Sequence, residues 1–195
     1  MVRLRKLTYY VAASIDGFIA DPAGRFDFFP IEADVMAAMN AVRPEAVPTA
    51  FRAAIGIADD TPNRSYDTVL MGRHSYTPGL EAGLTSPYAH LRQIVFSTTL
   101  TSPDPAVEVV AADPLGTVRK LKQEDGLGIW LCGGGTLASH LLPEIDELVI
   151  KQYPLVLGAG IPLFADAVPA HRFSLEEART FESGAVVLTY ACPSS

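Results

Sequence analysis

Three short segments rich in glycine or hydroxyl side chains follow apolar runs, and each could contact a phosphate. They are Gly72-Arg73-His74-Ser75, Ser97-Thr98-Thr99 and Gly133-Gly134-Gly135-Thr136. Glycine lets a ligand approach the backbone, arginine can hold a phosphate by two parallel hydrogen bonds, and helix N-termini attract anions. Each signal alone is weak, because a glycine run can be only a tight turn and an arginine after glycine only a solvated helix residue. Together they predict a dinucleotide surface, with glycines under the pyrophosphate and Arg73 and Ser97 near an additional phosphate.

Two carboxylates are candidates for catalysis. Asp27 lies among three phenylalanines in Phe26-Asp27-Phe28-Phe29, and an apolar wall would raise its pKa, which suits a group that orients or protonates a heteroaromatic substrate. Alternatively, Asp27 caps its own loop and the aromatic side chains are core contacts. Asp16 competes for the role, although in the turn Ser14-Ile15-Asp16-Gly17 it is typical of a carboxylate that hydrogen-bonds its own loop. The four histidines lack ligand spacing, so we expect no metal site.

The candidate residues need a scaffold of strands that alternate with helices. Runs rich in Val, Ile, Leu or Tyr predict strands at Leu7 to Ala13, Thr68 to Met71, Gln93 to Phe96, Val107 to Val110, Ile129 to Cys132, Glu147 to Leu155 and Ala185 to Ala191. Helices are expected directly after Gly72 and at Asp34 to Val42, Asp113 to Lys122 and Gly135 to Leu142, with Asp113 and Pro114 as an N-cap and N1 pair. Residues 44–63 are predicted to form a short helix and a loop that cover one end of the sheet.

This alternation indicates a three-layer α/β/α domain with a mostly parallel central sheet. The turn Glu182-Ser183-Gly184 adds a C-terminal antiparallel hairpin. Open parallel sheets bind ligands at the carboxyl ends of their strands, which is where the three phosphate-binding candidates lie. We therefore expect one domain over residues 1–195.

Composition limits the partners of this chain. It has 195 residues, 49% of them hydrophobic and 19% charged, which excludes a disordered tail or a coiled coil. A net charge of −7, from 15 basic and 22 acidic residues, argues against nucleic acid or an anionic membrane as partner. Cys132 and Cys192 are expected to be reduced thiols. No uninterrupted apolar run is long enough to span a membrane, so we expect a soluble, cytoplasmic protein that acts on a small molecule.

The order of several motifs resembles the dihydrofolate reductase-like superfamily, specifically the reductase domain of the bifunctional riboflavin-biosynthesis deaminase-reductase and its single-domain relatives. The resemblance covers nearly the whole chain and is specific only in combination. It rests on residues 13–20 (ASIDGFIA), 71–76 (MGRHSY), 133–135 (GGG), 154–164 (PLVLGAGIPLF) and 186–190 (VVLTY).

The resemblance implies an oxidoreductase that uses NADPH. Arg73 with Ser97 would contact the adenosine 2′-phosphate, Gly134 to Thr136 would lie under the pyrophosphate, and the loop from Ser14 to Ala20 would close over the nicotinamide. The full set of cofactor contacts expected from the resemblance is Ala13, Ile19, Gly72, Arg73, His74, Ser75, Ser97, Thr98, Gly133, Gly134, Gly135 and Thr136. Relatives with this closing segment pair through their C-terminal strands, so the resemblance also implies a homodimer.

The substrate is less well defined than the cofactor. Members of the family that reduce the riboflavin precursor resemble a pattern with lysine at two positions, which are Tyr10 and Phe18 in this sequence. The sequence also lacks a zinc-deaminase signature. The leading hypothesis is hydride transfer to a C=N or C=O carbon of a small pterin-like or pyrimidine-like compound. One alternative is the 5-amino-6-(5-phosphoribosylamino)uracil reductase of riboflavin biosynthesis. Another is a nucleotide-binding module without turnover, which tight NADPH binding without NADPH oxidation would indicate.

Overall fold

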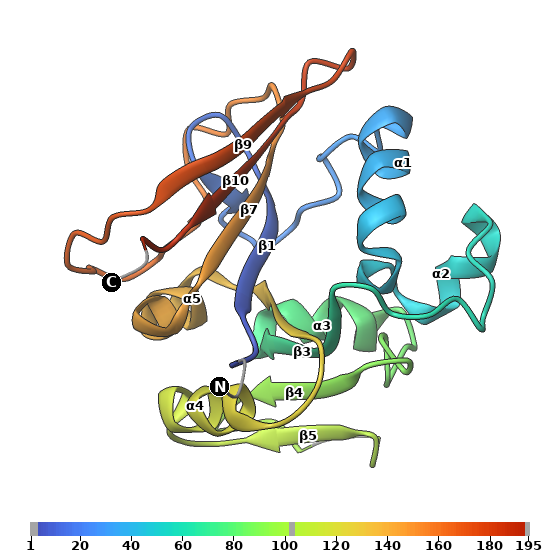
Figure 1. Ribbon diagram of the computed structural model, residues 1–195, viewed down its shortest axis with the longest axis vertical. Helices are drawn as coiled ribbons and strands as arrows, with labels where there is room; N and C mark the ends of the chain where they lie inside the picture. Colours follow the sequence, from blue (N-terminus) through green and yellow to red (C-terminus); the bar gives the residue numbers. More distant parts are fainter. Residues whose placement is uncertain (1–3, 102–103, 194–195) are drawn as a thin grey trace.

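A single large sheet organises the chain (Figure 1). The computed structural model describes residues 4–101 and 104–193, and within these residues eight strands pair in the order β5-β4-β3-β6-β1-β7-β10-β9. Their bounds are β1 Leu7–Ala13, β3 Tyr66–Gly72, β4 Arg92–Phe96, β5 Val107–Val110, β6 Gly128–Gly133, β7 Glu147–Gln152, β9 Ser174–Thr180 and β10 Val186–Ala191.

The strands from β5 to β7 in this order are parallel to one another. Strand β10 is antiparallel to β7, and β9 is antiparallel to β10, so the hairpin closes one edge of the sheet. Gly184 in the connecting turn has a φ of +85°, a conformation that favours glycine. The predicted fold class, a mostly parallel sheet with a C-terminal antiparallel hairpin, is confirmed.

Helices cover both faces of the sheet. Helices α1 (Ala33–Val42) and α3 (Arg73–Glu81) pack on the face that carries Trp130, whereas α4 (Pro114–Gln123) and α5 (Gly135–Leu141) pack on the face that carries Leu131. Figure 1 shows α1 and the pair α4 and α5 on opposite sides of the central strands. Consecutive residues of β6 thus serve different cores, as expected for a strand buried on both faces. The predicted N-cap of α4 is confirmed, because Asp113 accepts a hydrogen bond from the Gly116 N–H at 2.9 Å.

Short helical pieces follow α1, as the broken pattern of residues 44–63 predicted. They are the 3₁₀ turns η1 (Pro44–Ala46) and η2 (Ala53–Ile55), on either side of helix α2 (Thr49–Arg52). The buried carboxylate of Glu45 accepts hydrogen bonds from the backbone N–H groups of Arg64, Ser65 and Tyr66. Since these residues lead into β3, Glu45 anchors the amino end of the strand whose carboxyl end reaches Gly72.

Three strands were not predicted. Strands β2 (Phe18–Ala20) and β8 (Ile161–Pro162) pair antiparallel in a small separate sheet, and β9 is the outer strand of the large sheet. Strand β7 also ends three residues earlier than predicted, at Gln152, and α5 is followed by a 3₁₀ turn, η3 (Leu142–Glu144). In the part of the chain that the structure describes, no helix combines the length and apolar character needed to cross a membrane.

Candidate active site

The carboxyl ends of β3 and β6 bring two of the predicted phosphate-binding segments together. Met71 of β3 is in register with Gly133 of β6. A Cβ atom placed on Gly72 would lie 3.5 Å from the Gly134 nitrogen and 3.6 Å from the Gly133 carbonyl oxygen. The Ser75 hydroxyl would lie 3.2 Å from a Cβ on Gly133. Residues 72–75 and 133–134, about sixty positions apart in sequence, therefore form one continuous surface.

The third segment joins this surface through Arg73. Its Nη1 donates a 2.5 Å hydrogen bond to Oγ1 of Thr99, just beyond the end of β4. The Ser97 hydroxyl accepts hydrogen bonds from the backbone N–H groups of Thr99 and Leu100, so this side chain shapes the turn. Arg73, Thr98 and Thr99 are exposed to solvent. Arg73 is thus joined to the loop after β4 through Thr99, and Ser97, expected with Arg73 at the 2′-phosphate, lies in the same turn.

The two glycines at the start of α5, Gly134 and Gly135, differ in what surrounds them. A Cβ on Gly135 would collide with the Pro162 carbonyl oxygen and lie 3.2 Å from the Ala165 Cβ, so packing within the protein requires glycine there. Around Gly134, by contrast, the nearest atom to such a Cβ is the Ser75 Oγ, 3.8 Å away. Gly134 and the exposed Thr136 therefore border open space that a ligand can fill, whereas Gly135 does not.

The loop after β1 is tied down by Asp16. The Ser14 hydroxyl donates to Asp16 at 2.6 Å, and the carboxylate also accepts from the backbone N–H groups of Leu157 and Gly158. These hydrogen bonds, that of Ser14 foremost, hold the Asp16 pKa below its ordinary value. An ionised carboxylate held in this way tethers the loop and does not act as a proton donor at neutral pH.

The expected cofactor residues at either end of this loop are held by backbone pairing. The carbonyl of Ala13, the last residue of β1, accepts a 2.9 Å hydrogen bond from the Tyr153 N–H. Ile19 lies in β2, which pairs with β8. The loop therefore rests against residues 155–163 beside the N-terminus of α5.

Asp27 lies in a cavity of about 410 Å³ between the loop at residues 22–27 and α3. His74, Thr77, Glu81 and Ile161 line the same cavity. The expected apolar wall does not enclose the Asp27 carboxylate, which is exposed. Instead, Phe28 packs on Phe29, and Phe29 packs on Tyr153, with ring centroids 4.9 Å and 5.6 Å apart. Asp27 and His74, a residue expected to contact the cofactor, thus line the same cavity.

One polar group on the α1 face was missed from the sequence. The Lys151 Nζ lies 4.7 Å from the centroid of the Tyr10 ring, and Tyr153 follows two residues later. Burial raises the pKa of Tyr10 to about 12 and lowers the pKa of Lys151. The available signal was a lysine near the end of an otherwise apolar strand.

Solved structures of known proteins share this architecture. A protein assigned to riboflavin biosynthesis in Shewanella sp. PV-4 superimposes with a TM-score of 0.69 at 23% identity, covering 97% of this chain and 99% of its own. A dihydrofolate reductase from Enterococcus faecalis, solved with NADP(H) and RAB-propyl, gives a TM-score of 0.65 at 13% identity, covering 97% of both chains. At these identities the likeness shows the fold, which is that of the dihydrofolate reductases.

Sequence comparison narrows the relationship further. The uncharacterized protein YwjB of Bacillus subtilis (strain 168) is 31% identical over 183 residues, which cover 91% of this chain and 92% of the relative. The model of the RibD C-terminal domain matches residues 5–187, from before β1 into β10. This match confirms the resemblance inferred from the motifs: the chain belongs to the RibD C-terminal domain family.

Proposed function

We propose that the protein is an NADPH-dependent reductase that transfers hydride to a C=N or C=O carbon of a small heteroaromatic compound. The observation that carries this proposal is the convergence of the three glycine and hydroxyl segments at neighbouring strand ends. Membership of the RibD C-terminal domain family supports it, as does the fold shared with a dihydrofolate reductase solved with NADP(H). NADPH would supply the hydride, and a proton would pass to the substrate nitrogen or oxygen.

The residues of the proposed site have separate roles in binding the cofactor and the substrate. Arg73, with the hydroxyls of Thr98 and Thr99, would bind the 2′-phosphate, and Gly72, Ser75, Gly134 and Thr136 would surround the pyrophosphate, whose negative charge the free N–H groups at a helix start favour. Asp16 holds the loop from Ser14 to Ala20 against residues 157–158. Asp27, in the cavity that His74 also lines, would orient the substrate or deliver the proton.

Arg73→Ala tests the assignment of the 2′-phosphate. We expect its affinity for NADPH to fall about ten- to hundredfold, because one charge-assisted hydrogen bond contributes about 1.5–3 kcal/mol, while its weaker affinity for NADH stays unchanged. Isothermal titration calorimetry with both cofactors measures this. Arg92→Ala is the matched control, since Arg92 begins β4 at the opposite end of the strand and pairs there with Glu108 and Glu124. Equal dissociation constants of the wild type for NADPH and NADH would contradict the proposal.

Gly134→Ala and Gly135→Ala test which glycine is needed to bind NADPH and which is needed for packing within the protein. A methyl group at Gly134 meets no protein atom closer than 3.8 Å, so we expect normal stability and a loss of NADPH affinity. A methyl group at Gly135 meets the Pro162 carbonyl, so we expect a loss of about 1–3 kcal/mol or more in the free energy of unfolding. Urea unfolding and NADPH titration of both variants give the comparison. Unchanged NADPH affinity of Gly134→Ala would place the pyrophosphate elsewhere.

Asp27→Asn tests the catalytic carboxylate. We expect NADPH affinity to be retained while kcat/KM falls at least about tenfold, within the range that a positioned acid or base contributes. NADPH oxidation is followed with a panel of pterins, flavin precursors and quinones. Asp59→Asn, an exposed carboxylate beyond α2, is the control. A wild-type protein that binds NADPH tightly but oxidises it with none of these compounds would instead be a nucleotide-binding module.

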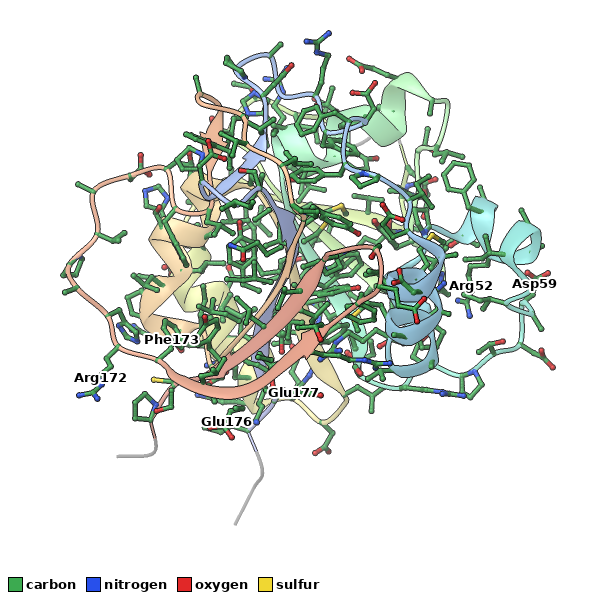
Figure 2. All side chains as sticks on the ribbon, turned by 90° about the horizontal axis from the view of Figure 1, so that it is seen from above. Arg52, Asp59, Arg172, Phe173, Glu176 and Glu177 are labelled. Carbon is green, nitrogen blue, oxygen red and sulfur yellow. The ribbon has the colours of Figure 1, made fainter. Side chains whose placement is uncertain are left out.

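We further infer a homodimer that forms through β9. All seven residues of this edge strand are exposed, and Leu175 retains 55% of its surface; Figure 2 shows Glu176 and Glu177 on the strand. An unpaired strand edge is a template for a second chain. We expect light scattering at micromolar concentration to give twice the chain mass, and Leu175→Lys, but not Leu127→Lys, to give the monomer. A monomeric wild type would refute the dimer.

A further inference from the structure

Lys151 is a cation whose place in the sheet points to a ligand. It lies near the carboxyl end of β7, in register with Ala12 of β1 on one side and Val187 of β10 on the other. Its ammonium lies over the Tyr10 ring, on the face that α1 covers. The carboxyl end of a parallel strand is where open α/β sheets bind their ligands. Strand β1 alone separates β7 from β6, so Lys151 lies on the order of 10 Å from the Gly133 loop.

Two other shielded cations, Lys122 and Arg5, have carboxylate partners, and the buried Arg52 donates to the Thr61 carbonyl, whereas Lys151 has no such partner among the residues that the structure describes. Lys122 pairs with Asp146 at 2.8 Å and with Glu144 at 3.5 Å, and Arg5 pairs with Asp67. Within residues 4–101 and 104–193, the Lys151 ammonium has neither an ion pair nor a hydrogen bond; it lies over the Tyr10 ring and interacts electrostatically with Tyr153, Cys132 and Arg43. Lys151 is partly buried and its ammonium is open to the surface, so a ligand that supplies a negative charge can reach it.

The surroundings of Lys151 suit a flat ligand with one negative charge. Arg43, the other cation at the Tyr10 ring, already donates to the Tyr66 hydroxyl at 2.8 Å and lies 4.0 Å from Glu147. One positive charge is therefore left, which matches a carboxylate better than a phosphate monoester, whose charge at neutral pH is between about −1.5 and −2. The Tyr10 ring at the ammonium belongs to an aromatic cluster, since it packs near Trp130 with ring centroids 6.1 Å apart.

Two tyrosine hydroxyls next to Lys151 are also without protein partners. Tyr10 and Tyr153 are each only 6% exposed, yet in the described part of the chain neither hydroxyl makes a hydrogen bond. Neither hydroxyl oxygen is fully buried, so both hydroxyls reach the surface and can donate to a ligand with oxygen or nitrogen acceptors. The low pKa that burial imposes on Lys151 is also relieved when an anion binds beside it.

We propose that Lys151 binds the carboxylate of a planar heteroaromatic substrate, with the Tyr10 and Tyr153 hydroxyls as further donors. The assignment rests on the proposed reductase function, because it places this substrate on the α1 face beside the cofactor loops. Lys151 is then the residue that determines specificity for an acidic substrate. Its contribution is to binding, and the reacting carbon lies elsewhere on the ring.

The first experiment compares the stability of Lys151→Met with that of Lys122→Met, without ligand. Methionine keeps most of the side-chain volume and removes the charge. We expect the Tm of Lys151→Met to stay level or to rise by about 2–4 °C. A rise of this size corresponds to a gain of about 1 kcal/mol in the free energy of unfolding for a chain of this length. The Tm of Lys122→Met should fall, because that change removes the cation that pairs with Asp146 and leaves Glu144 with Arg119 alone. A fall in the Tm of Lys151→Met as large as that of Lys122→Met would show that Lys151 is a structural cation and would overturn the proposal.

The second experiment measures binding of orotate and methyl orotate, with and without saturating NADPH. The two compounds differ in the charge of one carboxyl group. We expect the wild type to bind orotate at least about tenfold more tightly, Lys151→Met to lose that preference, and Lys151→Arg to keep part of it. No preference for orotate in the wild type, or an unchanged preference in Lys151→Met, would contradict the proposal.

The same variants separate this inference from the reductase proposal. If NADPH binds and is oxidised with some compound of the panel but orotate is not preferred over its ester, the carboxylate site fails and the reductase stands. If Lys151→Met loses a preference that the wild type shows while NADPH neither binds nor is oxidised, the carboxylate site stands and the reductase fails. NADPH affinity itself should be the same in Lys151→Met and in the wild type.

Discussion

Backbone packs directly on backbone where Gly135 meets Pro162, and the geometry of the whole site depends on this contact. Any side chain at Gly135 would displace the Pro162 carbonyl, and the Ala165 N–H donates to the Gly135 carbonyl at 3.2 Å. Because β8 pairs with β2, the start of α5 is joined through β8 to the loop that follows β1. Asp16 completes the connection at residues 157–158. The segment expected under the pyrophosphate and the loop expected over the nicotinamide are therefore positioned by one set of contacts.

The two faces of the sheet have different physical characters. The core under α4 and α5 is built almost wholly of aliphatic side chains such as Leu70, Ile94 and Leu131. The core under α1 and α3 contains Tyr10, Trp130 and other aromatic residues with polar ends, and Lys151 lies at its margin. Polar groups inside a core cost stability unless they are satisfied, so their concentration on one face indicates where function is located. On the proposals above, the aliphatic face contributes mainly stability and the aromatic face binds the substrate.

The sequence was informative where burial is strongest. The central strands carry apolar side chains on both faces, and the predicted bounds of β1 and β5 agree with the structure. Strand β9 (SLEEART) is exposed along its length, so no hydrophobic alternation marks it and only pairing with β10 makes it a strand. The Tyr153 N–H makes the last ladder bond to β1, at the Ala13 carbonyl, and strand β7 ends there because Pro154 has no N–H to donate. The apolar wall expected around Asp27 could not be judged from the sequence either, because Phe29 packs on Tyr153 and the Asp27 carboxylate is exposed.

A net charge of −7 does not prevent the proposed site from binding anions, because an anion responds mainly to the charges nearest to it. The convergence of the three cofactor segments could be predicted, since parallel strands end at a common edge and each segment follows a recognisable strand. The role of Lys151 could not, because it depends on the register of β7 with β1 and on the absence of a carboxylate that only the packed structure reveals. Tyr10 occupies a position at which the pattern of the riboflavin-type reductases has lysine. From the sequence alone, the substrate site therefore lacked a cation at this position. The fold supplies that cation from a strand 141 residues away, so a charge missing at one position in the sequence does not mean that it is missing from the site.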